Sequence, residues 1–79
     1  METQHEIILR TMLNNKSKTW WYASDFQKSV GYEASPRMSE ISYIYSNVVE
    51  KGKDGRFRTL RIRWENEKKV NELIKKLDL

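Results

Sequence analysis

The sequence SPRMSEISYIYSNVVEKGKDGRFRTLRIRW, residues 35–64, predicts a helix followed by a β-hairpin. Ser35-Pro36 is a typical helix start, because serine caps a helix N-terminus and proline at the first helical position loses no needed N–H group. The apolar residues that follow have the 3.6-residue period of an amphipathic helix and define its inward face. They are Met38, Ile41, Tyr45 and Val48, with Ile44 at one edge. The outward face is then Ser39, Glu40, Tyr43, Ser46 and Asn47, with Arg37 at its flank.

After Val48 the pattern changes to a period of two residues, which is typical of strands. Asp54-Gly55 lies between two strand-like runs and is a strong hairpin signal. Taking it as a two-residue turn predicts three pairs on one face: Lys53 with Arg56, Lys51 with Arg58, and Val49 with Leu60. This face changes from apolar at the base to cationic at the tip. Phe57 is out of phase with it and is expected to lean on Arg61 or to contact a partner.

The segment before residue 35 predicts two helices and a short strand. Apolar residues recur at helical spacing between Thr3 and Asn15, and Thr3 is a possible N-cap with Glu6 three positions on. An aromatic strand is expected over Lys18 to Tyr22. A short helix over residues 23–28 with a capping serine follows, and then a tight turn over residues 31–34.

The last segment, residues 65–79, predicts a helix that Asn66 can cap. Its apolar stripe has two possible uses, docking on its own domain or pairing with the same helix of a second chain. A homodimer would double the contacts on a palindromic site. Both uses stay open; the stripe consists of Val70, Leu73, Ile74 and Leu77.

Length and composition limit the protein to one small domain. A chain of 79 residues cannot divide its core between two units. It has no cysteine, so neither disulfides nor thiolate metal sites contribute to stability. No apolar run approaches the roughly 18 residues of a membrane span, and acids occupy Met1 to Arg10 where a signal peptide would have basic residues. We expect a cytoplasmic protein with no membrane partner.

The net charge of +4 comes entirely from residues 35–64, which hold seven basic and three acidic residues. The predicted hairpin places like charges opposite each other twice, at a cost of roughly 0.2 to 1 kcal/mol for each pair. A polyanion would remove that cost, so the concentration of charge favours nucleic-acid binding. The alternative is a solvated hairpin whose charges prevent edge-to-edge aggregation.

Catalysis finds little support in the sequence. His5 is the only histidine, and it is expected at the surface without a second metal ligand at a recognised spacing. The three glycines fit turns and do not form a phosphate-binding loop. The carboxylates are scattered among lysines. We therefore predict no enzymatic activity, no metal and no cofactor.

The order of these elements resembles the winged helix-turn-helix family of DNA-binding domains. The likeness lies in Ala23-Ser24-Asp25-Phe26, Gly31-Tyr32, the helix start at residues 35–41, and the residues 52–56 of the hairpin, or wing. It implies an α+β fold, with a three-helix core and a small antiparallel sheet over residues 1–64 and an additional C-terminal helix over residues 65–79. Small regulators of phages, prophages or archaeal viruses are similar in size.

In such families the third helix enters the major groove of DNA and the wing contacts the flanking backbone or minor groove. The resemblance thus implies noncatalytic binding of double-stranded DNA in transcription or replication, with nucleoid association. Glu40 departs from the basic recognition helices of many members. The DNA-binding residues implied here are Ser35, Arg37, Ser39, Tyr43, Lys51, Lys53, Arg56, Arg58 and Arg61.

Two other functions stay open. The domain is alternatively a protein interaction module, with Trp21, Tyr43 and Phe57 as exposed aromatic residues. It is alternatively a binder of RNA or single strands, with Trp20, Trp21 and Tyr22 as a stacking platform. Core packing is the preferred role for these last three residues, because large aromatic side chains dominate the burial available to a small domain.

Overall fold

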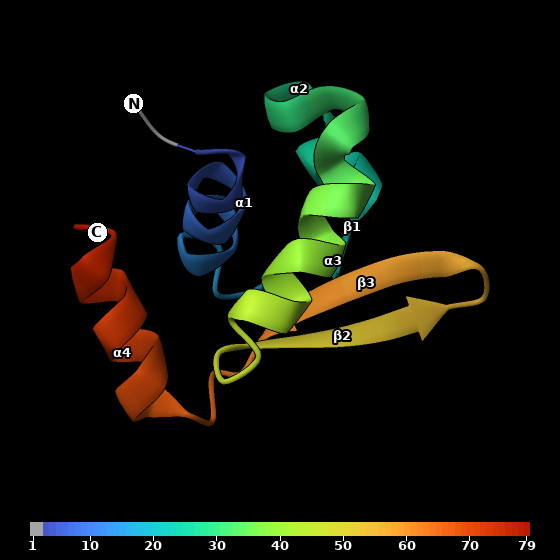
Figure 1. Ribbon diagram of the computed structural model, residues 1–79. Coiled ribbons are helices and arrows are strands. Elements are labelled where there is room, and N and C mark those ends of the chain that lie inside the picture. The colour runs from blue at the N-terminus through green and yellow to red at the C-terminus, as the bar shows by residue number, and fades with distance from the viewer. Residues whose placement is uncertain (1–2) are drawn as a thin grey trace.

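The computed structural model describes residues 3–79. It is an α+β structure in which α1 and α3 contact one face of a three-stranded antiparallel sheet (Figure 1). The elements are, in order, α1 (Gln4–Leu13), β1 (Trp21–Tyr22), the 3-10 helix η1 (Ala23–Phe26), α2 (Gln27–Val30), the 3-10 helix η2 (Gly31–Glu33), α3 (Ala34–Ile44), β2 (Val49–Asp54), β3 (Phe57–Ile62) and α4 (Glu67–Lys76).

The first helix follows its predicted pattern. The side chain of Thr3 accepts a hydrogen bond from the backbone N–H of Glu6 at 3.2 Å, so the predicted N-cap is confirmed. The apolar residues of α1 are all buried: Ile8, Leu9, Met12 and Leu13. They pack with residues of α3 and the sheet in a single core.

The strand order is β1-β3-β2. The predicted register of the hairpin is wrong: the turn lies one position later in the chain than predicted, so each residue of β2 pairs with a residue two positions further along β3. Asp54 pairs with Phe57, so the turn consists of Gly55 and Arg56. Gly55 has a φ of 63°, which suits the first central position of a type II′ turn, where glycine is favoured. The pairs on the cationic face become Lys53 with Arg58, Lys51 with Leu60, and Val49 with Ile62.

The starts of the middle helices also differ from the prediction. The helix α3 begins at Ala34 and continues directly from η2, so Ser35 lies inside its first turn and is not the N-cap. The start of η1 is held by Asp25, whose carboxylate accepts from the backbone N–H of Tyr22 at 2.7 Å. The predicted capping role of Ser24 is therefore wrong, because the carboxylate three residues after Tyr22 reaches back to this N–H instead.

The C-terminal helix docks on its own domain. Val70, Leu73 and Leu77 are buried within the single chain, and Ile74 packs half-buried against the same core. Arg10 of α1 donates a hydrogen bond from Nη2 to the carbonyl of Leu77 at 3.0 Å, which holds α4 beside α1 (Figure 1). Of the two predicted uses of the stripe, the structure shows docking, so most of the stripe is covered without a second chain.

The helix α4 starts where predicted, but Asn66 plays a different part. It occupies the N-cap position without a capping hydrogen bond from its side chain. Its amide donates instead to the carbonyl of Asn47 at 3.0 Å. This bond ties the start of α4 to the loop after α3.

The aromatic run is divided between the two faces of the sheet. Trp21 is only 5% exposed and stacks on Phe26, with ring centroids 5.5 Å apart. The preferred core packing is confirmed for Trp21, which pairs with the buried Leu60 on the core face, so the alternative in which Trp21 is exposed is wrong; Trp20 is 38% exposed and does not belong to the core. Trp20 lies on the other face, where its ring covers Gly52 and Thr59. No helix in the part of the chain described here has the length and hydrophobicity of a membrane span.

Candidate nucleic-acid interface

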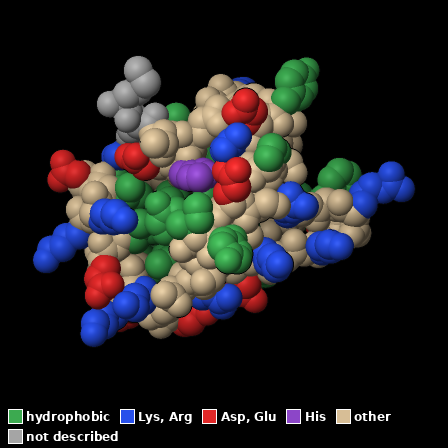
Figure 2. Space-filling view, in the orientation of Figure 1, with side chains coloured by type: hydrophobic (Ala, Val, Ile, Leu, Met, Phe, Trp, Pro, Cys, Tyr) green, Lys and Arg blue, Asp and Glu red, His purple; other side chains and the backbone are tan. Residues whose placement is uncertain are grey.

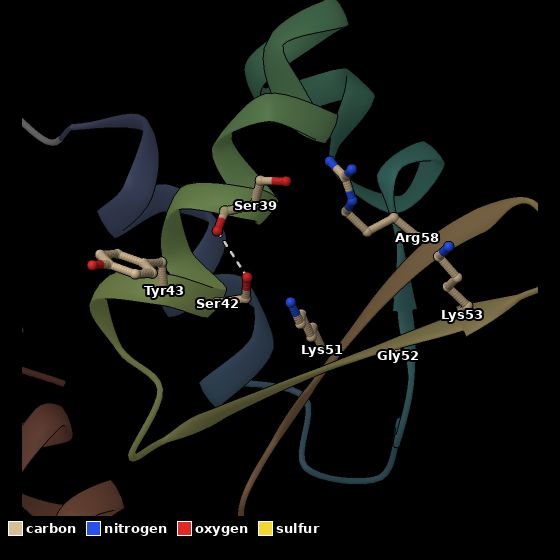
Figure 3. Close-up of a pocket in the computed structure, with 7 residues that line it drawn as sticks. All are labelled: Ser39, Ser42, Tyr43, Lys51, Gly52, Lys53 and Arg58. Carbon is tan, nitrogen blue, oxygen red and sulfur yellow. Dashed lines mark hydrogen bonds between the residues drawn. The ribbon is translucent and has the colours of Figure 1, made fainter.

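An open groove of about 540 Å³ lies between α3 and β2, and it brings together much of the predicted binding surface. Its sides are the exposed face of α3 and the cationic face of the hairpin (Figure 3). It is lined by Ser39, Ser42, Tyr43, Lys51, Gly52, Lys53 and Arg58. Five of these seven residues are among those that the resemblance implied.

Four cations of the hairpin have no carboxylate partner among residues 3–79. Lys51, Lys53, Arg56 and Arg58 are all exposed and form no ion pair there. Arg58 donates a hydrogen bond to the backbone carbonyl of Ser35 at 3.3 Å, which leads its guanidinium toward the start of α3. Figure 2 shows Lys and Arg side chains along the hairpin on the face turned to the viewer. These four residues are called the hairpin cations below.

Two other predicted DNA-binding arginines are held in ion pairs. Arg37 Nη1 lies 2.7 Å from a carboxylate oxygen of Glu40, and its Nε lies 3.7 Å from Glu33. Arg61 bonds to Glu65 at 2.9 Å and to Glu50 at 2.5 Å. The hydrogen bonds with Glu65 and then Glu50 raise the pKa of Arg61 above its ordinary value.

Arg61 also lies away from the groove. It pairs with Glu50 across the hairpin, on the face opposite to Lys51, and its guanidinium lies 5.9 Å from the ring centroid of Trp20. The structure therefore does not bring Arg37 and Arg61 together with the hairpin cations.

Glu40 is withdrawn from the groove. One of its carboxylate oxygens lies 2.7 Å from His5 Nε2 of α1 and also 2.7 Å from Arg37 Nη1. The hydrogen bond with His5, and then the charge of Arg37, hold the pKa of Glu40 below its ordinary value. Glu40 is not among the residues that line the groove. Glu40 was predicted on the outward face of the helix, but its carboxylate is turned toward His5 and Arg37 and not into the groove; His5 is half-buried in this contact and not simply exposed at the surface.

The α3 side of the groove consists mainly of hydroxyl groups. Ser35, Ser39 and Ser42 recur at spacings of four and three, which places them on one side of the helix. The Ser42 hydroxyl donates to the carbonyl of Ser39 at 2.7 Å, and Tyr43 is 86% exposed. Ser42 and Gly52 are groove residues that the sequence reasoning missed. The helical spacing from Ser39 was the signal that could have found Ser42.

The outward face of α3 does not extend as far along the chain as predicted. The helix α3 ends at Ile44, so Ser46 and Asn47 lie in the turn after it. The carbonyls of these two residues accept hydrogen bonds from Arg63 and Asn66. This turn therefore serves to join α3, the base of β3 and the start of α4.

A second groove of about 510 Å³ lies between the hairpin tip and η1. Phe57 lines it and is 63% exposed, and the hydroxyl of Tyr22 donates to the carboxylate of Asp54 across it. Arg56, Arg58 and Ser35 also border this groove. The hairpin cations thus continue around the tip, from one groove to the other.

Neither a metal-binding cluster in the described part of the chain nor a similar protein of known function indicates what this chain does. Within residues 3–79, no cluster of three or more His, Cys, Asp or Glu residues could hold a metal ion. No family model matches the chain, and neither a curated protein nor a solved structure matches it.

Proposed function

We propose that this chain is a winged-helix protein that binds double-stranded DNA without catalysing a reaction, with α3 facing the duplex and the β2–β3 hairpin as its wing. A role as a small regulator of transcription or replication follows from this activity. The observation that carries the proposal is the division among the cations. Arg37, Arg61 and Arg63 are paired with carboxylates, whereas the hairpin cations form no ion pair within residues 3–79. Three of the hairpin cations line the groove beside α3: Lys51, Lys53 and Arg58.

Unpaired cations held close together repel each other in the free protein. Lys53 lies directly opposite Arg58 in the hairpin, and like charges at such positions are destabilising. A phosphate backbone relieves this repulsion and releases condensed counterions, which is the main source of sequence-independent affinity for DNA. The fold keeps these charges in one place and at the edge of an open groove, where a polyanion can reach them.

Fluorescence anisotropy with a labelled duplex tests the proposal. Arg56→Glu and Arg58→Glu should each weaken binding by about tenfold or more, because each change turns an attraction to phosphate into a repulsion. The matched control is Lys68→Glu on α4, an exposed residue on an element distant from the hairpin (Figure 1). It makes the same change in net charge.

Two results would contradict the proposal. One is the absence of binding to any duplex at low salt. The other is an equal loss of affinity in the Lys68→Glu variant, which would assign the effect to net charge rather than to the hairpin.

A protein interaction module is the second candidate. It is favoured by the exposure of Tyr43 and Phe57, large aromatic side chains that border the two grooves. Binding of single strands has less support, because Trp21 is buried and Trp20 packs on Gly52. Competition of the labelled duplex by single-stranded DNA of the same length distinguishes duplex binding from single-strand binding, since only a duplex binder prefers the duplex.

A further inference from the structure

We infer that this protein binds duplex DNA with little dependence on base sequence, and that the groove between α3 and β2 receives the sugar-phosphate backbone. This inference rests on the proposed function, because it concerns how the same surface distinguishes its ligands. Three independent features of the surface carry it: the chemistry of α3, the pairing of the charged residues of α3, and the location of the cations.

The side chains that α3 presents to the groove are poor readers of bases. Ser39 and Ser42 carry hydroxyls, which both donate and accept and therefore bond to either partner on a base edge. Serine is also short, and the Ser42 hydroxyl already donates to the Ser39 carbonyl at 2.7 Å. The third groove residue of α3 is Tyr43, whose phenol likewise donates and accepts. None of these groups distinguishes one base pair strongly from another.

The side chains that do distinguish bases are missing from α3 or engaged elsewhere. Arginine and lysine read guanine, asparagine and glutamine read adenine, and glutamate accepts from cytosine. The sequence of α3 contains no Lys, Asn or Gln, and it has one Arg and one Glu. Those two residues, Arg37 and Glu40, bond to each other at 2.7 Å, and Glu40 also bonds to His5. Base readout would require these contacts to break.

The cations lie where they reach phosphates. In Figure 3 the side chains of Lys51 and Arg58 project from the hairpin toward α3, so ammonium and guanidinium groups face the serine hydroxyls. Phosphate oxygens accept hydrogen bonds from all of these groups, and such contacts position a duplex without carrying sequence information. Lys53 lines the same groove, and Arg56 extends the charge around the hairpin tip. The affinity therefore comes from the backbone.

Selection from a randomised library of duplexes tests the inference. The duplexes should have about 20 base pairs, because at 3.4 Å per step their length exceeds the longest dimension of the protein, 31 Å. Several rounds of selection should enrich no motif, and no selected duplex should bind more than about 30-fold more tightly than the starting pool, since specific sites typically exceed nonspecific DNA by 10³-fold or more.

A variant gives a second readout. Lys51→Ala should weaken binding to AT-rich, GC-rich and mixed duplexes by the same factor within about threefold, because a lost phosphate contact acts uniformly across sequences. Enrichment of a defined motif that binds more than about 30-fold more tightly than the starting pool would overturn the inference and leave the proposed function intact. Failure of the unselected pool to bind at low salt would instead overturn the proposed function itself.

Discussion

His5 Nε2 lies 2.7 Å from a carboxylate oxygen of Glu40, which joins α1 to α3 across 35 positions of the chain. The same carboxylate oxygen holds Arg37 at 2.7 Å. A single side chain thus links α3 to α1 and balances the charge of the only arginine in α3. Glu40 departs from the basic recognition helices of many winged-helix proteins, and in this structure it helps to hold α3 against α1.

Because its pKa lies below the ordinary value of 4.5, Glu40 stabilises the folded state only while it is ionised. A lowered pKa in the folded state means that this stabilisation is complete above the ordinary value and is lost as the pH falls through the folded value. Glu40→Gln should therefore lower the Tm at pH 7, and the difference in Tm from wild type should shrink progressively as the pH falls below the ordinary value of 4.5. Thermal melts between pH 7 and pH 3 measure this difference in Tm. A difference that persists undiminished at pH 3 would refute the prediction.

Much of the fold was predictable from the sequence because the helices and strands have clear periodicity. The apolar spacing of α1, α3 and α4 predicted their buried faces, and the Asp-Gly signal predicted the hairpin. The register was not predictable from that signal, because Gly55 suits either the second position of a type I′ turn or the first position of a type II′ turn. Only the pairing of Val49 with Ile62 in the core decides between them.

The candidate site was predictable only in part. Exposed cations on a hairpin follow from strand alternation, so Lys51, Lys53 and Arg58 were found. Ion pairs depend on tertiary contacts between distant segments, so the sequence could not show that His5 reaches Glu40. The two faces of a short strand are equally apolar in sequence, which is why the burial of Trp21 and the exposure of Trp20 could not be told apart.

Gly52 is required for the packing of Trp20 on the hairpin. A Cβ at this position would lie 2.7 Å from Trp20 Cζ3 and 2.8 Å from Thr59 Oγ1, which is too close for either atom to stay in place. Gly52→Ala should therefore lower the free energy of unfolding by about 1 to 3 kcal/mol. Urea denaturation measures this loss. The loss should be smaller in a Trp20→Ala background, where the ring no longer clashes; equal losses in both backgrounds would show that the contact with Trp20 is not the cause.

Leu73 packs into the core of its own chain. It is buried against its own domain, so Leu73→Ala should lower the free energy of unfolding by about 2 to 5 kcal/mol. Ile74→Ala is the matched control and should cost less, because Ile74 is only half-buried. The wild-type Tm should stay constant over about a hundredfold range of protein concentration, whereas a Tm that rises with concentration would indicate an obligate dimer.

The salt dependence of DNA binding should reflect the number of hairpin cations that contact phosphates. If all four do so, the logarithm of the association constant should fall against the logarithm of salt concentration with a slope of about −3.6, at roughly 0.9 for each phosphate. Lys53→Ala should make the slope shallower by about 0.9, because Lys53 is exposed and has no carboxylate partner among residues 3–79 that would compete with a phosphate. Lys68→Ala on α4 removes the same charge from a distant element and should leave the slope unchanged. A slope that responds equally to both substitutions would mean that the duplex senses the net charge of the protein, and the hairpin would lose its special role.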